Sequence, residues 1–477
     1  MERSRVIFGN VIADKDYQKA VKQKENYKKK LGDDSGTEYY FASKPNSVLA
    51  DIGVRDLVLA DPPGEALAEN AVIVGNIRMG YGHYRISAAI ASAANALGFV
   101  PYWLDLNAYP DSTATKLISR QNDLYSLGSR ISQRSKLFNS LVWEPINSEG
   151  FRKLTYNASD QKCSELMEPL LRHLPKNVPY IATHAWPAQA AVHAGFERVV
   201  NVIPDNWPMA LHLAEGSIHT VQTPSAYLGY KMLRGMDKKR VLKPMPEGSL
   251  FYTGHYVDHE MVVNIESDCA ARLERLRTGA ARRYLLSVGG AGAQQKLFED
   301  VIRALIPQVE AGEAALLINV GDHRKVWDSI VSHIPLLGDA TAHFNDYAAA
   351  KAFIEADEFA GIQVFCDEDI FAAVYLTNLL LRKCDVLLTK PSELSFYPVP
   401  KIMLRRVGGH EAWGAVRSAE VGEGTYECEK TEEVLALIDQ ITHGREILPA
   451  LCEGIRRANA AGIYNGAYEA VKLAINK

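Results

Sequence analysis

The sequence predicts an α/β protein with two Rossmann-like domains, each a parallel sheet covered by helices. From residue 71 onward, short apolar segments alternate with helical patterns, which is typical of parallel sheets. Each half opens with an apolar strand, a glycine-bearing turn and a helix, at residues 71–98 and again at residues 282–309. The length of 477 residues exceeds one ordinary domain and favours two.

The chain is expected to have five parts. Residues 1–70 form an N-terminal extension with a lysine-rich helix at 15–31 and two short apolar segments. The other four parts are an N-terminal Rossmann-like domain, a crossover, a C-terminal Rossmann-like domain and terminal helices, at residues 71–255, 256–280, 281–445 and 446–477. Strands are expected at 71–75, 100–105, 179–182, 199–203 and 218–222 in the first domain, and at 315–320, 341–344, 362–365, 385–389 and 401–404 in the second.

Composition excludes several classes of protein. The net charge of −4 gives no electrostatic case for nucleic-acid binding. None of the six cysteines forms a C-x-x-C pair, which argues against a structural zinc site or a disulfide framework. The N-terminus has no apolar signal segment, and no apolar run approaches the roughly 20 residues that span a bilayer. The sequence therefore predicts a cytoplasmic protein and leaves a peripheral membrane contact open.

The most informative segment is AVIVGNIRMGYGHYRISAAIASAANALG, residues 71–98. Glycines in its turn let the backbone approach a bound group, and the start of the following helix offers N–H donors and a partial positive charge. His83 follows Gly82 directly at this point. A histidine there can take a proton from a reacting hydroxyl near neutral pH.

The second half repeats this arrangement. The turn 287–295 lies between an apolar strand and a helix, where backbone N–H groups can receive a diphosphate. Later strands end in further polar groups, and a structural turn, a helix cap or a solvated surface loop is the alternative for each. The candidate nucleotide-sugar-binding residues are Gly82, Gly289, Gly290, Gly292, Ala293, Gln294, Gly321, Asp322, Lys390, Ser392, Glu393, Gly409, His410 and Glu411.

Two segments of the first half, THAWPAQ (183–189) and NVIPDNWPMALHL (201–213), also place polar and aromatic groups after apolar strands. His184, Asn206 and Trp207 are the candidates on the acceptor side, and Asp205 is a catalytic candidate with His83. The alternative for His184 is a core histidine with satisfied hydrogen bonds. Neither H-E-x-x-H nor G-x-S-x-G occurs, so no metal site and no nucleophile elbow is predicted.

In order and spacing, these motifs resemble the GT-B-fold nucleotide-sugar glycosyltransferases of family 28. That group contains monogalactosyldiacylglycerol synthases, processive diacylglycerol glucosyltransferases and the N-acetylglucosaminyltransferase that makes lipid II. The resemblance spans roughly residues 71–440. YGHYR resembles the family's G-G-H segment, IPDNWPMALH its aspartate-bearing stretch, VQTPSAYLGYKMLRGM the next strand and helix, and LFYTGHYVD its TG-x-P-V crossover. LLSVGGAGAQQ resembles its diphosphate turn, VLLTKPSEL its TK-P-G-G-x-T strand end, and GGHEAWGA its G-Q-E-x-x-N loop.

The resemblance implies two Rossmann-like domains facing a central cleft. It implies an inverting, metal-independent transfer of sugar from a nucleotide-diphosphate-sugar, a UDP-sugar by this likeness, with no cofactor. His83 would deprotonate a hydroxyl acceptor, and the turn 289–295 would hold the diphosphate. Two departures stand out: Val257 replaces the usual proline, and the segment 391–400 is shorter by about a helical turn or two than the family's ribose-binding helix.

In lipid-modifying relatives, the position of residues 113–155 holds a membrane-facing region, which here would suit a lipid acceptor. Leu, Phe and Trp mixed with Arg and Lys are typical of an interfacial surface, and a helical lid packed on the domain is the alternative. Three other functions remain open. They are a UDP-sugar epimerase or hydrolase, a non-catalytic nucleotide-sugar-binding relative, and an NAD-dependent dehydrogenase with Asp105 at the ribose.

Overall fold

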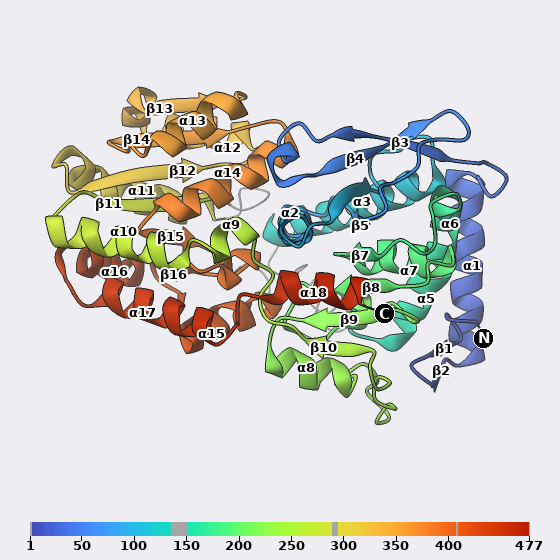
Figure 1. Cartoon of the computed structure of the whole chain (residues 1–477). Helices are drawn as coiled ribbons and strands as arrows, with labels where there is room; N and C mark the ends of the chain where they lie inside the picture. The colour runs from blue at the N-terminus through green and yellow to red at the C-terminus, as the bar shows by residue number, and fades with distance from the viewer. Residues whose placement is uncertain (1, 135–149, 289–293, 407–408, 477) are drawn as a thin grey trace. The chain divides into compact units, whose positions relative to one another are not determined.

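A computed structural model of the chain describes residues 2–134, 150–288, 294–406 and 409–476. The chain divides into two compact units (Figure 1). Unit 1 comprises Met1–Asp258 and Asn465–Lys477, and unit 2 comprises His259–Tyr464. The division falls inside the predicted crossover, 256–280. The last helix of the chain belongs to unit 1.

In the described part of unit 1, the main sheet has eight strands in the order β10-β9-β8-β7-β5-β6-β4-β3. Neighbouring strands are parallel, except that β3 is antiparallel to β4. The strands are β3 (Tyr40–Pro45), β4 (Arg55–Ala60), β5 (Ala71–Asn76), β6 (Val100–Asp105), β7 (Tyr180–Ala182), β8 (Val199–Val202), β9 (Ile218–Val221) and β10 (Leu250–Tyr252). A separate two-stranded sheet joins β1 (Val6–Ile7) to β2 (Asn10–Val11).

The helices of unit 1 are α1 (Asp14–Leu31), α2 (Gly82–Ala96), α3 (Thr113–Arg134), α5 (Leu154–Ser164), α6 (Glu168–Leu171), α7 (Ala185–His193), α8 (Pro224–Lys231) and α18 (Gly466–Ile475). The alanine-rich sequence of α2 explains its position. Residues 84–94 of α2 are all buried, and small side chains allow the helix to lie close to β5, β6 and α18. The glycine turn that precedes α2 is thereby held at the end of β5.

The N-terminal extension contributes to the sheet. Arg55 of β4 lies opposite Tyr102 of β6 in parallel register, and β3 pairs with β4 along its full length. The two short apolar segments noted in the extension therefore form β3, an edge strand of the unit 1 sheet, and β4 beside it. The lysine-rich helix, α1, packs against α5.

In the part of unit 2 that the structure describes, seven parallel strands follow the order β13-β14-β12-β11-β15-β16-β17. They are β11 (Arg282–Ser287), β12 (Ala314–Asn319), β13 (Thr341–Phe344), β14 (Ile362–Cys366), β15 (Val386–Thr389), β16 (Lys401–Leu404) and β17 (Gly424–Cys428). The helices are α9 (His259–Val262), α10 (Ile265–Thr278), α11 (Gln295–Glu310), α12 (Arg324–His333), α13 (Tyr347–Ala356), α14 (Ile370–Lys383), α15 (Ala412–Val421), α16 (Thr431–His443) and α17 (Ile447–Ala460). The predicted α/β class with two parallel-sheet domains is confirmed.

Each sheet has a point where the chain reverses its direction of winding. In unit 1, β5 lies between β6 and β7, and in unit 2, β11 lies between β12 and β15. Ligands of open parallel sheets gather outside the carboxyl ends of strands at such points. The first glycine turn predicted from the sequence follows β5 and falls where this rule places a ligand, and the second begins in the chain after β11.

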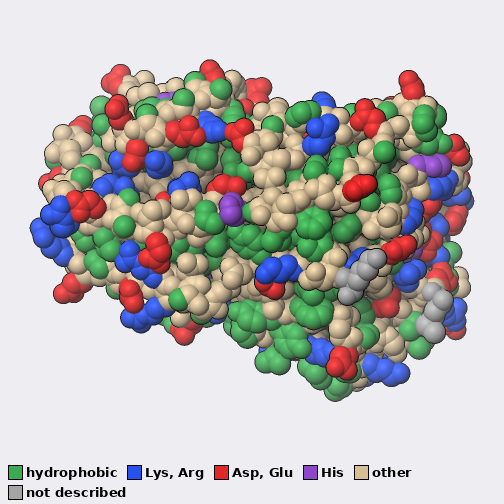
Figure 2. Space-filling model, in the orientation of Figure 1, with side chains coloured by type: hydrophobic (Ala, Val, Ile, Leu, Met, Phe, Trp, Pro, Cys, Tyr) green, Lys and Arg blue, Asp and Glu red, His purple; other side chains and the backbone are tan. Residues whose placement is uncertain are grey.

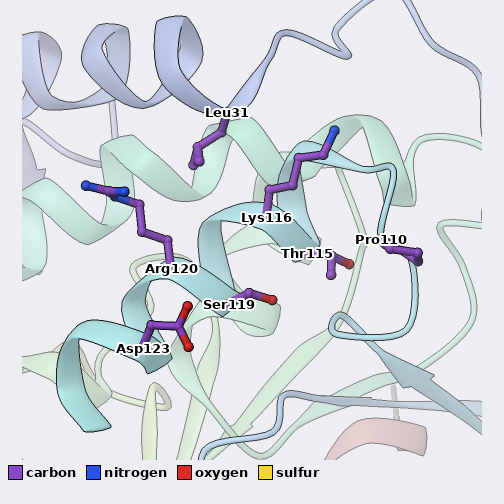
Figure 3. Close-up of a pocket in the computed structure, with 7 residues that line it drawn as sticks. All are labelled: Leu31, Pro110, Thr115, Lys116, Ser119, Arg120 and Asp123. Atoms are coloured by element: carbon purple, nitrogen blue, oxygen red, sulfur yellow. The ribbon is translucent and has the colours of Figure 1, made fainter. Parts of the chain in front are cut away.

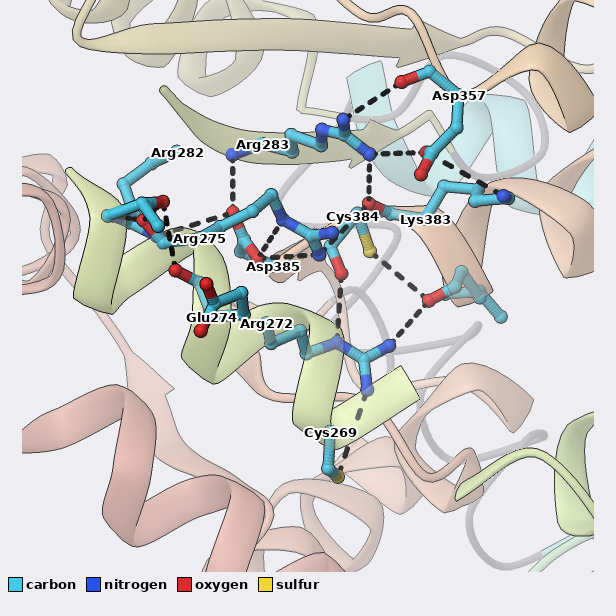
Figure 4. A network of polar contacts seen from close by, with 12 residues as sticks. Cys269, Arg272, Glu274, Arg275, Arg282, Arg283, Asp357, Lys383, Cys384 and Asp385 are labelled. Atoms are coloured by element: carbon cyan, nitrogen blue, oxygen red, sulfur yellow. Dashed lines mark hydrogen bonds and ion pairs between the residues drawn. The ribbon is translucent and has the colours of Figure 1, made fainter. Parts of the chain in front are cut away.

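The opposite, amino end of the unit 2 sheet is closed by a buried charged network (Figure 4). Asp385 stands just before β15 and is fully buried. It accepts hydrogen bonds from Arg275 Nε and from the backbone N–H of Arg283, both at 2.9 Å. The fully buried Arg272 donates to the carbonyls of Cys384 and Leu381 at 2.9 and 2.8 Å. These bonds join α10, β11, α14 and β15.

Candidate functional site

The candidate base, His83, lies in the first turn of α2 and is half-buried. Its Nδ1 lies 2.6 Å from the carbonyl oxygen of Thr183, the residue that follows β7. A carbonyl only accepts, so Nδ1 carries the proton of this bond. In the neutral ring the lone pair is therefore on Nε2, the nitrogen that a general base would use. The bond also joins the carboxyl ends of β5 and β7.

His184 is the N-cap residue of α7, and its Nδ1 accepts the backbone N–H of Trp186 at 3.1 Å. Its ring is only 4% exposed and meets the His83 ring edge-on, with centroids 4.9 Å apart. Burial, followed by the nearby His83 and His212, holds the pKa of His184 well below its usual value. His184 is thus a neutral ring packed behind His83, and it agrees with the alternative of a core histidine.

The catalytic candidate Asp205 lies in the loop after β8 and is 39% exposed. Its Oδ2 lies 3.1 Å from Nε2 of His212, a buried residue. Nδ1 of His212 lies 2.7 Å from the hydroxyl of Tyr230, which in turn lies 3.1 Å from the carbonyl of Trp207. Asp205 is therefore held by a connected set of polar side chains. It lies close enough to His184 to raise the pKa of that ring, against the larger effect of burial.

The acceptor-side candidates Asn206 and Trp207 are also tied into the loop. Oδ1 of Asn206 accepts a hydrogen bond from Thr223 Oγ1 at 3.2 Å. The guanidinium of Arg152 lies 4.7 Å from the centre of the Trp207 ring, a cation–π contact. The loop that carries Asp205 is thus fixed on both sides.

His212 and Tyr230 were not singled out from the sequence. His212 stands in a 3₁₀ turn seven residues after Asp205, and Tyr230 lies in α8. Both lie within segments quoted for the family resemblance, but neither was a candidate there. Tyr230 reaches His212 because strands β8 and β9 are neighbours, whereas His212 lies in the same loop as Asp205. A loop containing both Asp and His is the one signal that the sequence offered.

In unit 2, four candidates of the glycine turn, Gly289, Gly290, Gly292 and Ala293, lie outside the described residues. Gln294 is the N-cap residue of α11, with φ of 74°. Its side-chain amide donates to the carbonyl of Arg405, just after β16. The side chain of Gln294 therefore holds the start of α11 against the end of β16.

The segment after β15 contains an ion pair made by Lys390 and a helix cap made by Ser392. The ammonium of Lys390 pairs with the carboxylate of Glu411, which lies in the 3₁₀ turn Gly409–Glu411 before α15. Ser392 caps the short 3₁₀ helix Glu393–Phe396, and its hydroxyl accepts the N–H of Leu394 at 3.4 Å. This 3₁₀ turn stands where the family resemblance implied a longer helix. The side chain of His410 lies outside the described residues.

The remaining candidates follow β12. Gly321 has φ of +60°, and its N–H donates to Asn319 Oδ1 at 2.8 Å. Oδ1 of Asp322 lies 3.2 Å from Nδ1 of His323. The structure therefore brings Lys390 and Glu411 into direct contact, while Gly321 and Asp322 stand at the end of β12, which β11 separates from β15. Over the described residues, no group of three or more His, Cys, Asp or Glu side chains is placed to hold a metal ion.

Asp105, the ribose candidate of the dehydrogenase alternative, already has partners. It accepts hydrogen bonds from the Tyr84 hydroxyl and, at 2.8 Å, from the backbone N–H of Asn107. Burial raises the pKa of this carboxyl group. Asp105 thus has an internal structural function.

Most of the described part of segment 113–155 is α3, and beside its start lies an open depression of about 460 Å³ (Figure 3). Lys116 and Arg120 line this depression, with Leu31 and Pro110 as its apolar part. Hydrophobic side chains also gather on the surface at α8 and β10, where Leu228, Met232 and Tyr252 are exposed (Figure 2). Among the helices that the structure describes, none is long and apolar enough to cross a bilayer.

Comparisons with known proteins divide the chain at nearly the same place as the structure does. Residues 6–232 match the family model described as a domain of unknown function, DUF6937, and residues 245–475 match a second one, DUF6938. No curated protein matches the chain.

Solved structures similar to the chain include UDP-GlcNAc 2-epimerase from Neisseria meningitidis, at 10% identity and a TM-score of 0.46, covering 85% of this chain and 100% of that one. A putative UDP-N-acetylglucosamine 2-epimerase from Listeria monocytogenes shows 13% identity and a TM-score of 0.46, covering 85% and 95%. A glycosyltransferase from Rickettsia africae shows 11% identity and a TM-score of 0.38, covering 86% and 100%. Similarities of this size do not assign a reaction.

Proposed function

We propose that the chain is a nucleotide-sugar enzyme that transfers a sugar from a nucleotide-diphosphate donor, a UDP-sugar, to a hydroxyl acceptor. The observation that carries the proposal is the bond from His83 Nδ1 to the Thr183 carbonyl, 2.6 Å long, at the reversal point of the unit 1 sheet. It fixes the ring and leaves Nε2 as the basic atom of the neutral form. The start of α2, beside it, favours a group of developing negative charge.

The chemical step follows from these groups. Nε2 of His83 takes the proton of the acceptor hydroxyl while its oxygen forms a bond to the anomeric carbon. The bond from that carbon to the diphosphate oxygen breaks, and the nucleoside diphosphate leaves with the electron pair. Attack on the face opposite the leaving group inverts the configuration. In unit 2, Lys390 and the backbone of the turn after β11 would bind the diphosphate, so no divalent metal is required.

The test compares His83→Ala with His443→Ala, a control on the exposed face of α16 in unit 2. UDP release is measured with UDP-sugars and hydroxyl acceptors, with and without EDTA. His83→Ala should lower turnover by about 10²-fold or more, the usual effect of a general base, and leave UDP binding unchanged. His443→Ala and EDTA should have no effect. Full turnover in His83→Ala would remove this residue from the mechanism.

The pair of Asp205 and His212 favours a second candidate, a UDP-sugar epimerase or hydrolase. Their 3.1 Å contact supplies a second acid–base group beside the His83 and His184 rings. Product analysis separates the two functions. An epimerase changes the sugar without an acceptor, and a hydrolase releases UDP and free sugar from water alone. A membrane contact through residues 113–155, with a lipid acceptor, remains a prediction that flotation with anionic vesicles would test.

A further inference from the structure

Helix α5 buries polar side chains that the proposed reaction does not use. Asn157, Asp160, Gln161 and Ser164 all lie on buried positions of this helix. The amide of Asn157 has a clear structural function, since it donates to the carbonyls of Ala210 and Leu213, both at 2.8 Å. Asp160 differs, because it is 7% exposed and its Oδ2 has no hydrogen-bond partner within the described part of the chain.

The carboxyl group of Asp160 lines a cavity of about 10 Å³. Such a volume holds about one water molecule. The polar side chains around it are uncharged and come from three helices: Gln23 of α1, Gln121 of α3 and Ser164 of α5. Cys163 and Trp186 complete the group of ionisable or polar neighbours.

Among the described residues that line this cavity, none carries a positive charge. Lys24, the nearby ammonium on α1, pairs with Glu165 at 2.6 Å. Burial accordingly raises the pKa of Asp160 to about 8, and a hydrogen bond from the Trp186 side chain only partly offsets this. At neutral pH the group is therefore a neutral carboxylic acid.

Trp186 connects this acid to the candidate site. Its backbone N–H donates to Nδ1 of His184 at 3.1 Å, and its ring meets the His184 ring edge-on with centroids 4.9 Å apart. The His184 ring meets that of His83 in the same way, again at 4.9 Å. Asp160, Trp186, His184 and His83 thus form an unbroken series of contacts from α5 through α7 to α2.

We propose that Asp160 is a positioning residue, whose neutral carboxyl group accepts the indole N–H of Trp186 and so holds the His184 and His83 rings in place. Whether Asp160 matters for turnover rests on the proposed function, but the series of contacts from Asp160 to His83 is independent of that function. Ionisation of Asp160 would place an uncompensated charge in the cavity and draw water to it. Trp186 would then shift, and the surroundings of the His83 ring would change when Asp160 ionises, although the two side chains are not in contact.

The experiment records the indole N–H of Trp186 and the ring C–H signals of His83 by NMR in the full chain, from about pH 6 to pH 9, a range that contains the pKa of Asp160 near 8. His83→Asn and Trp186→Phe identify the signals. In the unaltered chain, both signals should show an inflection near pH 8. Asp160→Asn, which keeps the shape and stays neutral, should abolish this inflection and keep the low-pH spectrum.

Asp123→Asn is the matched control, because Asp123 is an exposed carboxylate on α3. It should leave the inflection in place, and Trp186→Phe should remove it from His83. An unaltered chain without an inflection, or an inflection that persists in Asp160→Asn, would overturn the proposal. UDP release separates this result from the proposed reaction: if His83→Ala keeps full activity, the reaction mechanism fails, while the NMR result still decides whether Asp160 positions the rings.

Discussion

The buried ion pair of Lys401 and Glu423 gives a quantitative prediction about the stability of unit 2. Both side chains are 0% exposed, and Lys401 Nζ lies 3.1 Å from Glu423 Oε1. The hydroxyl of Tyr464 also donates to Glu423. Burial lowers the pKa of Lys401 and raises that of Glu423, while each partner opposes the shift of the other. The pair joins the start of β16 to the residue just before β17.

The expected magnitude follows from Coulomb's law. At a separation of 3.1 Å and an effective dielectric constant of roughly 20, the attraction is about 5 kcal/mol. Lys401→Met or Glu423→Gln alone should destabilise unit 2 by about 3–5 kcal/mol, because the remaining group stays buried without its partner. The double variant Lys401→Met/Glu423→Gln should cost much less than the sum, since no uncompensated charge remains.

Hydrogen exchange in increasing urea, measured on peptides that cover β16 and β17, reports the stability of unit 2 separately from that of unit 1. The coupling energy comes from the two single variants and the double variant. Arg457 and Glu453 form an exposed pair at 2.9 Å in the same unit and are the matched control, with an expected coupling below about 1 kcal/mol. If the effects of Lys401→Met and Glu423→Gln add to within about 0.5 kcal/mol, the buried pair does not stabilise the sheet and the reasoning is wrong.

Three further changes test other parts of the fold. In the folded chain the pKa of Asp160 is about 8, raised from 3.8, so the free energy of unfolding should fall by about 3 kcal/mol between about pH 5.5 and pH 8.5, where the carboxyl group is ionised in the unfolded chain and protonated in the folded one. Asp160→Asn should remove this fall. Parallel pH profiles for the two proteins would contradict the prediction. Gly75→Ala should cost about 1–3 kcal/mol, since the new methyl group would lie 2.2 Å from the Tyr180 hydroxyl, and thermal denaturation measures it. Asp385→Ala should destabilise unit 2 by about 3–5 kcal/mol, because it breaks the buried ion pair with Arg275. UDP affinity should be unchanged when it is measured at equal concentrations of folded protein. A loss of affinity without a loss of stability would refute a purely structural role for Asp385.

The sequence predicted the central strands well because their signal is local. Residues 100–105 and 401–404 were expected as strands and form β6 and β16 within the same bounds. These runs are apolar or β-branched, and glycine turns or helices border them. Where the side chains of a strand are buried on both faces, composition alone marks it.

Strands at or near the edges of the sheets were harder to predict, although residues 341–344 were expected and form β13 at one edge of the unit 2 sheet. The segment GTYEC forms β17, an edge strand with several partly exposed side chains, and it lacks an apolar run. The three residues of β10 are too few for a periodic pattern. β4 was noted only as an apolar segment, because its place beside β6 depends on pairing with residues more than forty positions away. Such strands are defined by their partners, which one sequence does not specify.

The candidate site shows the same division between local and long-range information. His83 could be found because a strand, a glycine turn and a helix occur together within a few residues. Asp160 could not, because α5 has no apolar stripe and its polar residues suggest a solvated helix. Its burial results from α1 and α7, which pack on it from distant parts of the sequence. A buried polar group of this kind becomes visible only once its neighbours are known.

The two ends of the unit 2 sheet differ in chemistry, and this difference separates stability from function. At the amino ends of β11 and β15, charged groups such as Arg275 and Asp385 bond to one another. At the carboxyl ends, the polar groups stand in loops, and Lys390 pairs with the carboxylate of Glu411, which an anionic ligand could replace. A phosphate group that displaced Glu411 would gain a cation already positioned for it, because the Lys390 side chain is ordered before the ligand arrives. Lys390→Ala should therefore weaken UDP binding without the loss of stability expected for Asp385→Ala. If the two variants lose equal stability, the carboxyl end of the sheet is as important for stability as the amino end, and the separation of the two roles is wrong.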